Sequence, residues 1–403
     1  MKTSILNIML FKKKRIYADA AAATPISPRA KAELIRLLDV YGNAGALHTE
    51  GVAAKNELEK AREVVAKSIG AHANEIVFTG SGTEGNNLAL QGILRPLLRA
   101  GKKVHAITSV IEHSSVLEPL RALSREGLML TELPVDSEGL VSVKEFADAI
   151  TEDTVLVSIQ YINSEIGTVE PLREIAKEIR YARKQRTSGL PLYFHTDASQ
   201  APMWFDIKVE RLGVDLLTLD AQKIMGPKGV GALYIHRGVS IEPVLSGSKQ
   251  ERGLRGGTEN IPLVGAFATA LADVSIGIED RAARVAEVRN YMWKEIQERV
   301  PDAVLNGPSF EHRAPNNLNI SIPGLDREMA VIGLDAEGIA ITTRSACNVA
   351  DSELSYVVVA LGQGEEQAKG AVRITLLPDA TKADAVAIAN AFQKIAKRYK
   401  NVV

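Results

Sequence analysis

Two side chains of this 403-residue chain stand where they could do chemistry. Asp197 ends an apolar run, where a carboxylate is costly unless it meets a cation such as the ring nitrogen of a pyridinium cofactor. Lys223 follows another apolar run and precedes Gly-Pro-x-Gly, a setting in which a lysine with a lowered pKa could form a Schiff base. Alone, a helix-capping aspartate and a solvated lysine explain the same residues equally well or better. Their occurrence on neighbouring predicted strands favours the chemical interpretation.

A third signal is the turn Gly80-Ser81-Gly82-Thr83, between a short apolar run and a predicted helix. Free backbone N–H groups and the helix dipole make such a turn favourable for a phosphate. Plain helix initiation, with Thr83 as the N-cap, explains the turn at least as well.

Cys347 is the chain's one cysteine, which excludes intrachain disulfides, zinc ribbons and iron–sulfur clusters ligated within one chain. We therefore expect a reducing compartment and a cytoplasmic location. A lone cysteine can be a small buried apolar residue. The polar neighbours of Cys347, Arg344 among them, instead favour an exposed, activatable thiol on a mobile loop.

Charge and hydropathy narrow the choice of partners. The chain has 48 Lys+Arg and 49 Asp+Glu, a net charge of −1, which argues against a strongly basic nucleic-acid-binding surface. No run approaches the length of a membrane-spanning helix, so neither nucleic acid nor membrane is expected as a partner. In residues 1–15 the apolar run precedes the basic one, the reverse of a secretory signal. We expect a short strand and a solvated basic turn there.

Helical and strand-like segments alternate between about residues 50 and 240, which predicts an α/β fold with a mostly parallel sheet covered on both faces. Ligands in such sheets bind beyond the carboxyl ends of the strands, where the residues above all fall. A glycine-rich, charged stretch (246–258) is expected to be an exposed loop, followed by a long helical region over about 261–300. The predicted strands are 75–79, 103–108, 154–162, 192–196, 215–219, 231–235, 317–322 and one beginning at Arg373.

In addition, a series of short motifs resembles the cysteine desulfurases, pyridoxal-phosphate enzymes of aminotransferase class V. The motifs occur in the family's order from Tyr17 to about Thr381. The cysteine loop resembles that of the subgroup in which this loop is longer. The matching segments are 17–25, 41–43 with His48, 79–87, 112–113, 163–167, 195–200, 223–229, 250–260, 315–319, 345–347, 361–362 and 373–375.

This resemblance implies a type I pyridoxal-phosphate transferase fold with a large and a smaller α/β domain. The expected parts are an N-terminal segment (1–16) packing with the small domain, a large cofactor-binding domain (17–260) and a small domain (261–403) carrying the cysteine loop. It also implies a homodimer with shared active sites.

The implied residue roles centre on pyridoxal phosphate. Lys223 would hold it as a Schiff base, Asp197 would pair with the ring nitrogen, and His113 would stack on the ring and move protons. The other expected contacts are Gln200 to the phenolic oxygen, Gly82 and Thr83 to the phosphate, Thr258 to the phosphate in the other subunit, Ser164 and Gln222 to the cofactor, and Arg373 and Asn43 to the substrate.

Cys347 matches the family's nucleophile, which implies conversion of L-cysteine to L-alanine with the sulfur kept as a persulfide. A longer cysteine loop implies delivery to an acceptor or scaffold protein, for iron–sulfur cluster assembly or tRNA thiolation. No metal site is expected. The sequence names neither the acceptor nor the role of the basic N-terminal segment.

Several residues depart from the family pattern near the cofactor. Asp220 and Gln222 stand where a serine and a histidine usually lie near the phosphate. A carboxylate beside a group of charge about −1.5 to −2 is repulsive, so Asp220 points away, is neutralised, or lowers cofactor affinity. Ser164 replaces an asparagine, Ala23 a threonine and Arg344 a glycine.

These departures keep two alternatives open. One is another class V lyase or aminotransferase, such as a selenocysteine lyase, which need not depend on Cys347. The other is a sulfur-delivery homologue whose catalysis is weakened at Asp220, Gln222 and Ser164.

Overall fold

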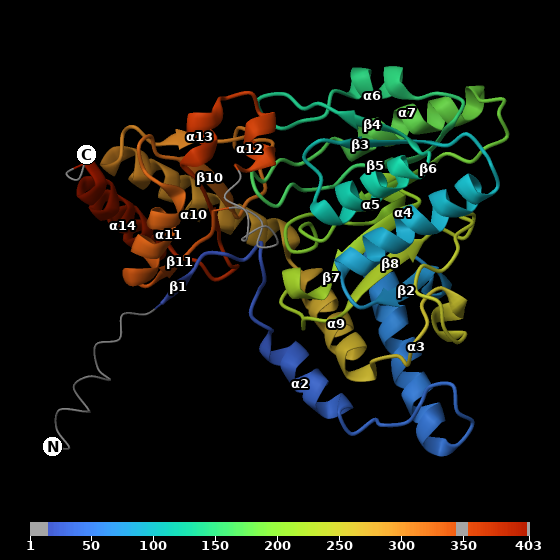
Figure 1. Ribbon diagram of the computed structural model, residues 1–403. Coiled ribbons are helices and arrows are strands. Elements are labelled where there is room, and N and C mark those ends of the chain that lie inside the picture. Colours follow the sequence, from blue (N-terminus) through green and yellow to red (C-terminus); the bar gives the residue numbers. More distant parts are fainter. Residues whose placement is uncertain (1–14, 344–353, 401–403) are drawn as a thin grey trace.

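A computed structural model of the chain describes residues 15–343 and 354–400 (Figure 1). It consists of a large α/β part with a seven-stranded sheet and a smaller part with a three-stranded and a two-stranded sheet. The predicted fold class, a mostly parallel sheet in a large part with a smaller α/β part beside it, is thereby confirmed. Cys347 and the predicted strand in residues 1–14 lie outside the described residues.

The large sheet has the strand order β2-β8-β7-β6-β5-β3-β4. Strands β7, β6, β5, β3 and β4 are mutually parallel, whereas β8 is antiparallel to both of its neighbours, β7 and β2. All but β4 coincide within a few residues with strands predicted from continuous apolar runs, as expected where both faces are buried. The strands are β2 (Ile76–Thr79), β3 (His105–Ser109), β4 (Met129–Leu133), β5 (Thr154–Ser158), β6 (Tyr193–Asp197), β7 (Leu216–Asp220) and β8 (Gly231–Ile235).

Helices cover both faces of this sheet, and successive strand residues alternate between two apolar clusters. Leu216 of β7 belongs to the cluster that includes α4 and α5, and Leu217 to the cluster on the other face. Such alternation follows from the period of two in an extended chain. The helices of this part are α2 (Pro28–Leu37), α3 (Thr49–Ile69), α4 (Gly82–Arg99), α5 (Ser114–Arg125), α6 (Val143–Ala149), α7 (Leu172–Gln185), α8 (Val209–Leu212) and α9 (Ile261–Val274), with the 3₁₀ turns η1 (Ala73–Glu75), η2 (Ala221–Lys223) and η3 (Gln250–Gly253).

The long helical region predicted over 261–300 is two helices, α9 and α10 (Ile278–Arg299), which meet at 76°. Gly277, in the left-handed region at φ 62°, precedes α10. Helix α9 packs on α2 and α3, whereas α10 packs on α14 (Lys382–Lys400) of the smaller part. The predicted domain boundaries stay a prediction. Among the described residues no single helix has the length and apolarity to cross a membrane; only the bent pair α9 and α10 meets these criteria jointly.

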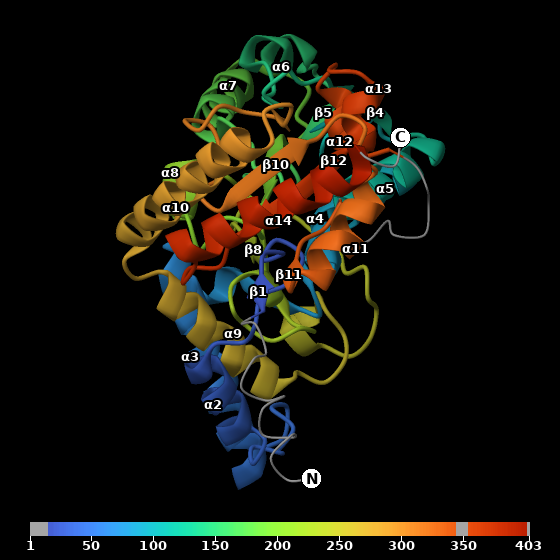
Figure 2. The same cartoon turned by 90° about the vertical axis from the view of Figure 1, so that its left-hand side faces the viewer.

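In the smaller part the strands order as β12-β10-β9, all antiparallel. Figure 2 shows α14 lying across this part beside α11 and α10. The N-terminal strand β1 pairs in parallel with β11, so the chain enters through the smaller part and then crosses to the large one. The elements are β1 (Ile16–Tyr17), β9 (Val304–Leu305), β10 (Asn317–Ser321), β11 (Ile339–Ala340), β12 (Ala371–Thr375), α11 (Arg327–Ala336), α12 (Tyr356–Ala360) and α13 (Glu365–Lys369).

The glycine-rich stretch 246–258 is not simply an exposed loop, as the sequence predicted. Glu251, within η3, is buried, and its carboxylate accepts two hydrogen bonds of 2.7 Å from the buried Arg62 guanidinium of α3. It also accepts the Phe78 N–H at 2.8 Å. This buried ion pair ties the stretch to the sheet, because a buried charge requires a partner.

Candidate active site

A cavity of about 400 Å³ lies where strands β6 and β7 end and helices α4 and α5 begin. The segment that follows β1 and Arg373 of β12, from the smaller part, also line the cavity. Most of the residues selected from the sequence line it together. Its lining consists of Ala21, Ala22, Ala23, Gly82, Thr83, His113, Ser115, Gln160, Ile162, Ser164, Asp197, Ser199, Gln200, Asp220, Gln222, Lys223, Lys228 and Arg373.

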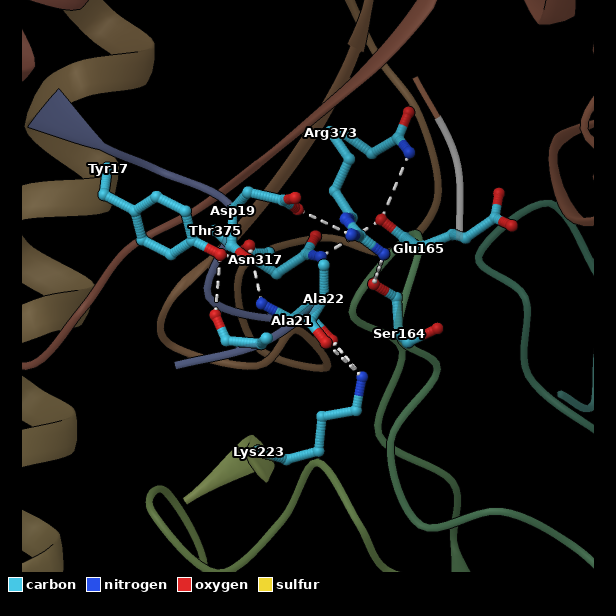
Figure 3. A network of polar contacts seen from close by, with 12 residues as sticks. Tyr17, Asp19, Ala21, Ala22, Ser164, Glu165, Lys223, Asn317, Arg373 and Thr375 are labelled. Atoms are coloured by element: carbon cyan, nitrogen blue, oxygen red, sulfur yellow. Dashed lines mark hydrogen bonds and ion pairs between the residues drawn. The ribbon is translucent and has the colours of Figure 1, made fainter. Parts of the chain in front are cut away.

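Lys223, the last residue of η2, extends its amine toward the segment after β1 (Figure 3). Nζ donates to the carbonyl oxygens of Ala21 at 2.8 Å and Ala22 at 2.6 Å. The same segment is tied to the lysine turn by Thr24, whose N–H donates to the Gln222 carbonyl at 2.8 Å. The backbone carbonyls of Ala21 and Ala22 hold the amine within the cavity.

Asp197 ends β6, and both of its carboxylate oxygens are fixed by donors. Oδ1 accepts the Ser199 N–H at 2.9 Å, and Oδ2 accepts the Asn86 side-chain amide at 2.7 Å. Asn86 is fully buried on α4 and also donates to Ser115 Oγ at 2.8 Å. These two donors fix the orientation of the carboxylate.

His113 is the N-cap of α5 and is connected to Asp197 through this network. Its Nδ1 accepts the Ser115 N–H at 3.1 Å and lies 2.8 Å from Ser115 Oγ. Because a backbone N–H can only donate, Nδ1 carries no proton, which leaves the ring proton of the neutral side chain on Nε2. No role for Asn86 was predicted, although it lies in the motif 79–87, because its contacts with Ser115 and Asp197 join segments that are distant in sequence.

Two buried titratable side chains, His195 and Glu112, lie close to the site residues Asp197 and His113 in the sequence. His195, between Ser158 Oγ at 2.9 Å and Thr218 Oγ1 at 3.0 Å, has its pKa lowered to about 4 by burial, which outweighs the opposing effect of Asp197. Burial raises the pKa of Glu112 well above its usual value. His195 is therefore neutral around pH 7 and acts as a structural link between strands rather than as a proton carrier.

Arg373 of β12 brings a buried guanidinium to the cavity from the smaller part (Figure 3). Nη2 donates to Asp19 Oδ1 at 2.8 Å, and Nη1 donates to the Ser164 carbonyl at 3.0 Å. Asp19 was given no role in the sequence, although it falls in the motif 17–25. An incoming substrate carboxylate would therefore have to share the Arg373 guanidinium with Asp19.

At the opposite end of the cavity, the carboxylate of Asp220 lies over the first turn of α4. Oδ2 accepts the Gly82 N–H at 3.1 Å and the Gln222 side-chain amide at 3.2 Å, and Oδ1 accepts the Gln222 N–H at 3.2 Å. A Cβ on Gly82 would lie 3.1 Å from the Asp220 Cβ, so the approach depends on glycine. The α4 N-cap is Ser81, whose Oγ accepts the Glu84 N–H, and not Thr83, the cap in the alternative interpretation of this turn. The Asp220 side chain therefore does not point away from the expected phosphate position, which excludes one of the three options that the sequence leaves open.

Three predicted residues are not brought to this cavity by the described part of one chain. Asn43 is exposed and lines a separate cavity beside Arg62 and Glu251. Thr258 is exposed, and Cys347 lies outside the described residues. Their roles stay predictions. Within the described ranges, no group of three or more His, Cys, Asp or Glu is arranged to hold a metal ion.

The cavity fits one end of pyridoxal phosphate and conflicts with the other. Lys223 can reach an aldehyde, and Asp197 supplies a fixed carboxylate for a protonated ring nitrogen. Of the two residues that the resemblance assigned to the phosphate, Gly82 and Thr83, the first has its backbone N–H already bonded to Asp220.

Known proteins resemble this chain over nearly its full length. The Aminotransferase class-V family model matches residues 16–388. The chain is 38% identical over 391 residues to "Cysteine desulfurase IscS" of Dictyoglomus turgidum, covering 97% of this chain and 96% of the relative. A solved "NifS-like protein" superposes with a TM-score of 0.88 at 32% identity, covering 95% and 100% of the two chains. A structure described as "SspA in complex with cysteine" has a TM-score of 0.77 at 31% identity, covering 90% and 99%.

Proposed function

Because this chain belongs to the aminotransferase class V family, we propose that it is a pyridoxal-phosphate-dependent cysteine desulfurase that converts L-cysteine to L-alanine. The observation that carries the proposal is the convergence of Lys223, Asp197 and His113 on one cavity. The relatives named as cysteine desulfurases, and a structural relative described with bound cysteine, support the choice of substrate.

Bound pyridoxal phosphate would supply an electron sink for bonds at the substrate's α-carbon. Asp197, fixed by Asn86 and Ser199, would keep the ring nitrogen protonated, and Lys223 would hold the cofactor and exchange with the substrate amine. His113 would move protons through Nε2, since its Nδ1 accepts the Ser115 N–H.

The Arg373 guanidinium would bind the carboxylate of the substrate cysteine alongside Asp19. The Cys347 thiolate would attack the substrate sulfur as the Cβ–S bond breaks, so that the enzyme keeps a persulfide. The substrate carbon receives the replacing proton and leaves as alanine. Atoms then balance: cysteine plus enzyme thiol gives alanine plus enzyme persulfide.

We also propose a homodimer with shared active sites. Large apolar side chains are exposed on the α2–α3 region, which extends from the rest of the molecule (Figure 1). Asn43 and Thr258 are exposed beyond the cavity of their own chain, as residues reaching a partner's cavity would be. The apolar side chains concerned are Ile35, Leu38, Tyr41 and Leu47. The sulfur acceptor is proposed to be a separate protein in the cytoplasm, serving iron–sulfur cluster assembly or tRNA thiolation, because one chain has no second cysteine to pass the sulfur to.

The test is turnover combined with absorbance. Purified protein supplied with pyridoxal phosphate should develop the visible absorbance of a lysine-bound cofactor and release alanine from L-cysteine in the presence of a thiol acceptor. Cys347→Ala should keep the absorbance and lose sulfur transfer. If Cys347→Ala transferred sulfur at the wild-type rate, or selenocysteine were consumed and cysteine were not, the desulfurase proposal would be wrong.

A second candidate, a homologue with weakened catalysis, is supported by the Asp220 carboxylate at the expected phosphate position. It differs in outcome: the cofactor would not bind even at high concentration, while Cys347 would still accept and deliver sulfur supplied by another enzyme.

A further inference from the structure

At the first turn of α4, the groups that line the cavity differ from those that a phosphate requires. Helix α4 is 18 residues long, and two of its first three N–H groups, those of Gly82 and Glu84, meet side-chain acceptors. The Gly82 N–H donates to Asp220 Oδ2, and the Glu84 N–H donates to Ser81 Oγ. A helix N-terminus favours negative charge, and here a side chain of the same protein already supplies it.

Asp220 is held firmly in this position. Its side chain is buried at 7% exposure and accepts three hydrogen bonds, two of them from Gln222. The two residues that depart from the family pattern next to the phosphate therefore contact each other. Gln222 donates where the family's histidine usually stands, and its partner is a carboxylate instead of a phosphate. Two hydrogen bonds thus join the two residues.

Two other charged side chains of the cavity have hydrogen-bond partners of their own. Lys223 donates to the carbonyls of Ala21 and Ala22, and Arg373 is paired with Asp19. Lys228 lines the cavity but is an exposed side chain. A phosphate placed at Gly82 would meet a buried like charge that already uses the N–H the phosphate needs.

We propose that Asp220, held by Gln222, is a resident anion at the phosphate end of the cavity and determines cofactor specificity, so that the chain discriminates poorly between pyridoxal phosphate and unphosphorylated pyridoxal. The inference rests on the proposed function, since it presumes a pyridoxal-type cofactor on Lys223. Pyridoxal phosphate must displace the carboxylate from Gly82 in order to bind, whereas pyridoxal leaves it in place. Both ligands react with Lys223 in the same way, so the ratio of their affinities isolates the phosphate end.

The experiment is a titration of the full-length protein with pyridoxal phosphate and, separately, with pyridoxal, followed by absorbance at one pH. Asp220→Asn keeps the shape and removes the charge, and Asp220→Ser introduces the residue usual in the family. Asp206→Asn is the matched control, because it removes one negative charge outside the cavity, where Asp206 pairs with Arg211. Both Asp220 variants should raise the affinity ratio of pyridoxal phosphate to pyridoxal by at least about tenfold, and Asp206→Asn by less than about twofold.

An unchanged ratio in both Asp220 variants would overturn the inference. If neither variant folds, the wild-type ratio decides: we expect pyridoxal phosphate to bind within about 100-fold of pyridoxal, and a preference above about 1,000-fold contradicts a resident anion. Inorganic phosphate gives an independent readout, because it should strengthen pyridoxal binding to Asp220→Ser and leave the wild type unaffected. Failure of the proposed function looks different: neither ligand then reacts with wild type or variants.

Discussion

Asp197 and Asp220 end neighbouring parallel strands, β6 and β7, and line the same cavity, yet the first faces the position expected for a ligand cation and the second occupies the position expected for a ligand anion. Asp197 is fixed by Asn86 and the Ser199 N–H and connects through Ser115 to His113. Asp220 is fixed by the Gly82 N–H and Gln222. One carboxylate stands where a ring cation would come, and the other where an anion would come. The value of a carboxylate at a strand end therefore depends on the ligand charge it faces.

Replacing the first of the two carboxylates should have the largest effect. Asp197→Asn removes the negative charge that keeps the ring nitrogen protonated, so kcat/KM for L-cysteine should fall by at least about 100-fold. Steady-state alanine release measures it, with Asp220→Asn as the matched variant. Equal losses of activity in the two variants would contradict the different roles assigned to Asp197 and Asp220.

The Asn86 amide should matter less, because it acts through its neighbours. Asn86→Ala removes the donor to Asp197 Oδ2 and Ser115 Oγ, and we expect kcat to fall roughly tenfold, as for loss of a hydrogen bond to a charged group. The pH at which the cofactor spectrum changes should shift as well. A loss of activity without that spectral shift would mean that Asn86 supports packing and not the carboxylate.

Gln222 separates the charge of Asp220 from its packing. Gln222→Ala removes one donor to Asp220 Oδ2 but leaves the carboxylate and its bond to Gly82. Affinity for pyridoxal phosphate should change by less than about fivefold, which corresponds to the roughly 1 kcal/mol of one ordinary hydrogen bond. If Gln222→Ala matched Asp220→Asn, the position of the carboxylate and not its charge would be decisive.

Glu170 is a buried carboxyl that lacks the full set of donors found at Asp197 and Asp220. Its Oε2 accepts the Val141 N–H at 3.1 Å, and within the described residues its buried Oε1 has no hydrogen-bond partner. Burial raises the pKa of Glu170 from 4.5 to about 8. The folded state thus retains a proton on Glu170 that the unfolded chain releases. The contribution of protonated Glu170 to the free energy of unfolding is therefore lost as pH rises from about 4.5 to 8.

Glu170→Gln should remove this pH dependence. We expect its Tm to exceed that of the wild type by a few degrees at pH 8 and by progressively less toward pH 5, measured by thermal melts at both pH values. A margin that grew toward acid pH would contradict the sign of the pKa shift.

The strands and the main chemical residues could be predicted because each depends on local sequence. Asp197 and Lys223 both follow apolar runs, and parallel strands bring their carboxyl ends to one edge. Other features depend on residues distant in sequence. Asn86 bridges α5 and β6, and Glu251 is buried only because Arg62 of α3 meets it.

Local choices between similar candidates were harder to predict. Ser81 and not Thr83 caps α4, since both hydroxyls suit a cap and only the geometry of the turn selects one. The helical region after residue 260 breaks before α10, at a Gly277 that sequence alone does not distinguish from a tolerated glycine. The sequence alone indicates a conflict between the Asp220 carboxylate and a phosphate, but only the structure shows where the Asp220 side chain points.

The most direct test of the central claim, that Lys223 is the cofactor lysine of this cavity, is borohydride reduction followed by peptide mapping. Reduction after addition of pyridoxal phosphate fixes the Schiff base as a stable amine on whichever lysine formed it. Lys228 lines the same cavity and is the internal control. The account predicts a stoichiometric adduct on the peptide containing Lys223, located at that side chain by fragmentation. An adduct on Lys228, or none on either lysine, would contradict it.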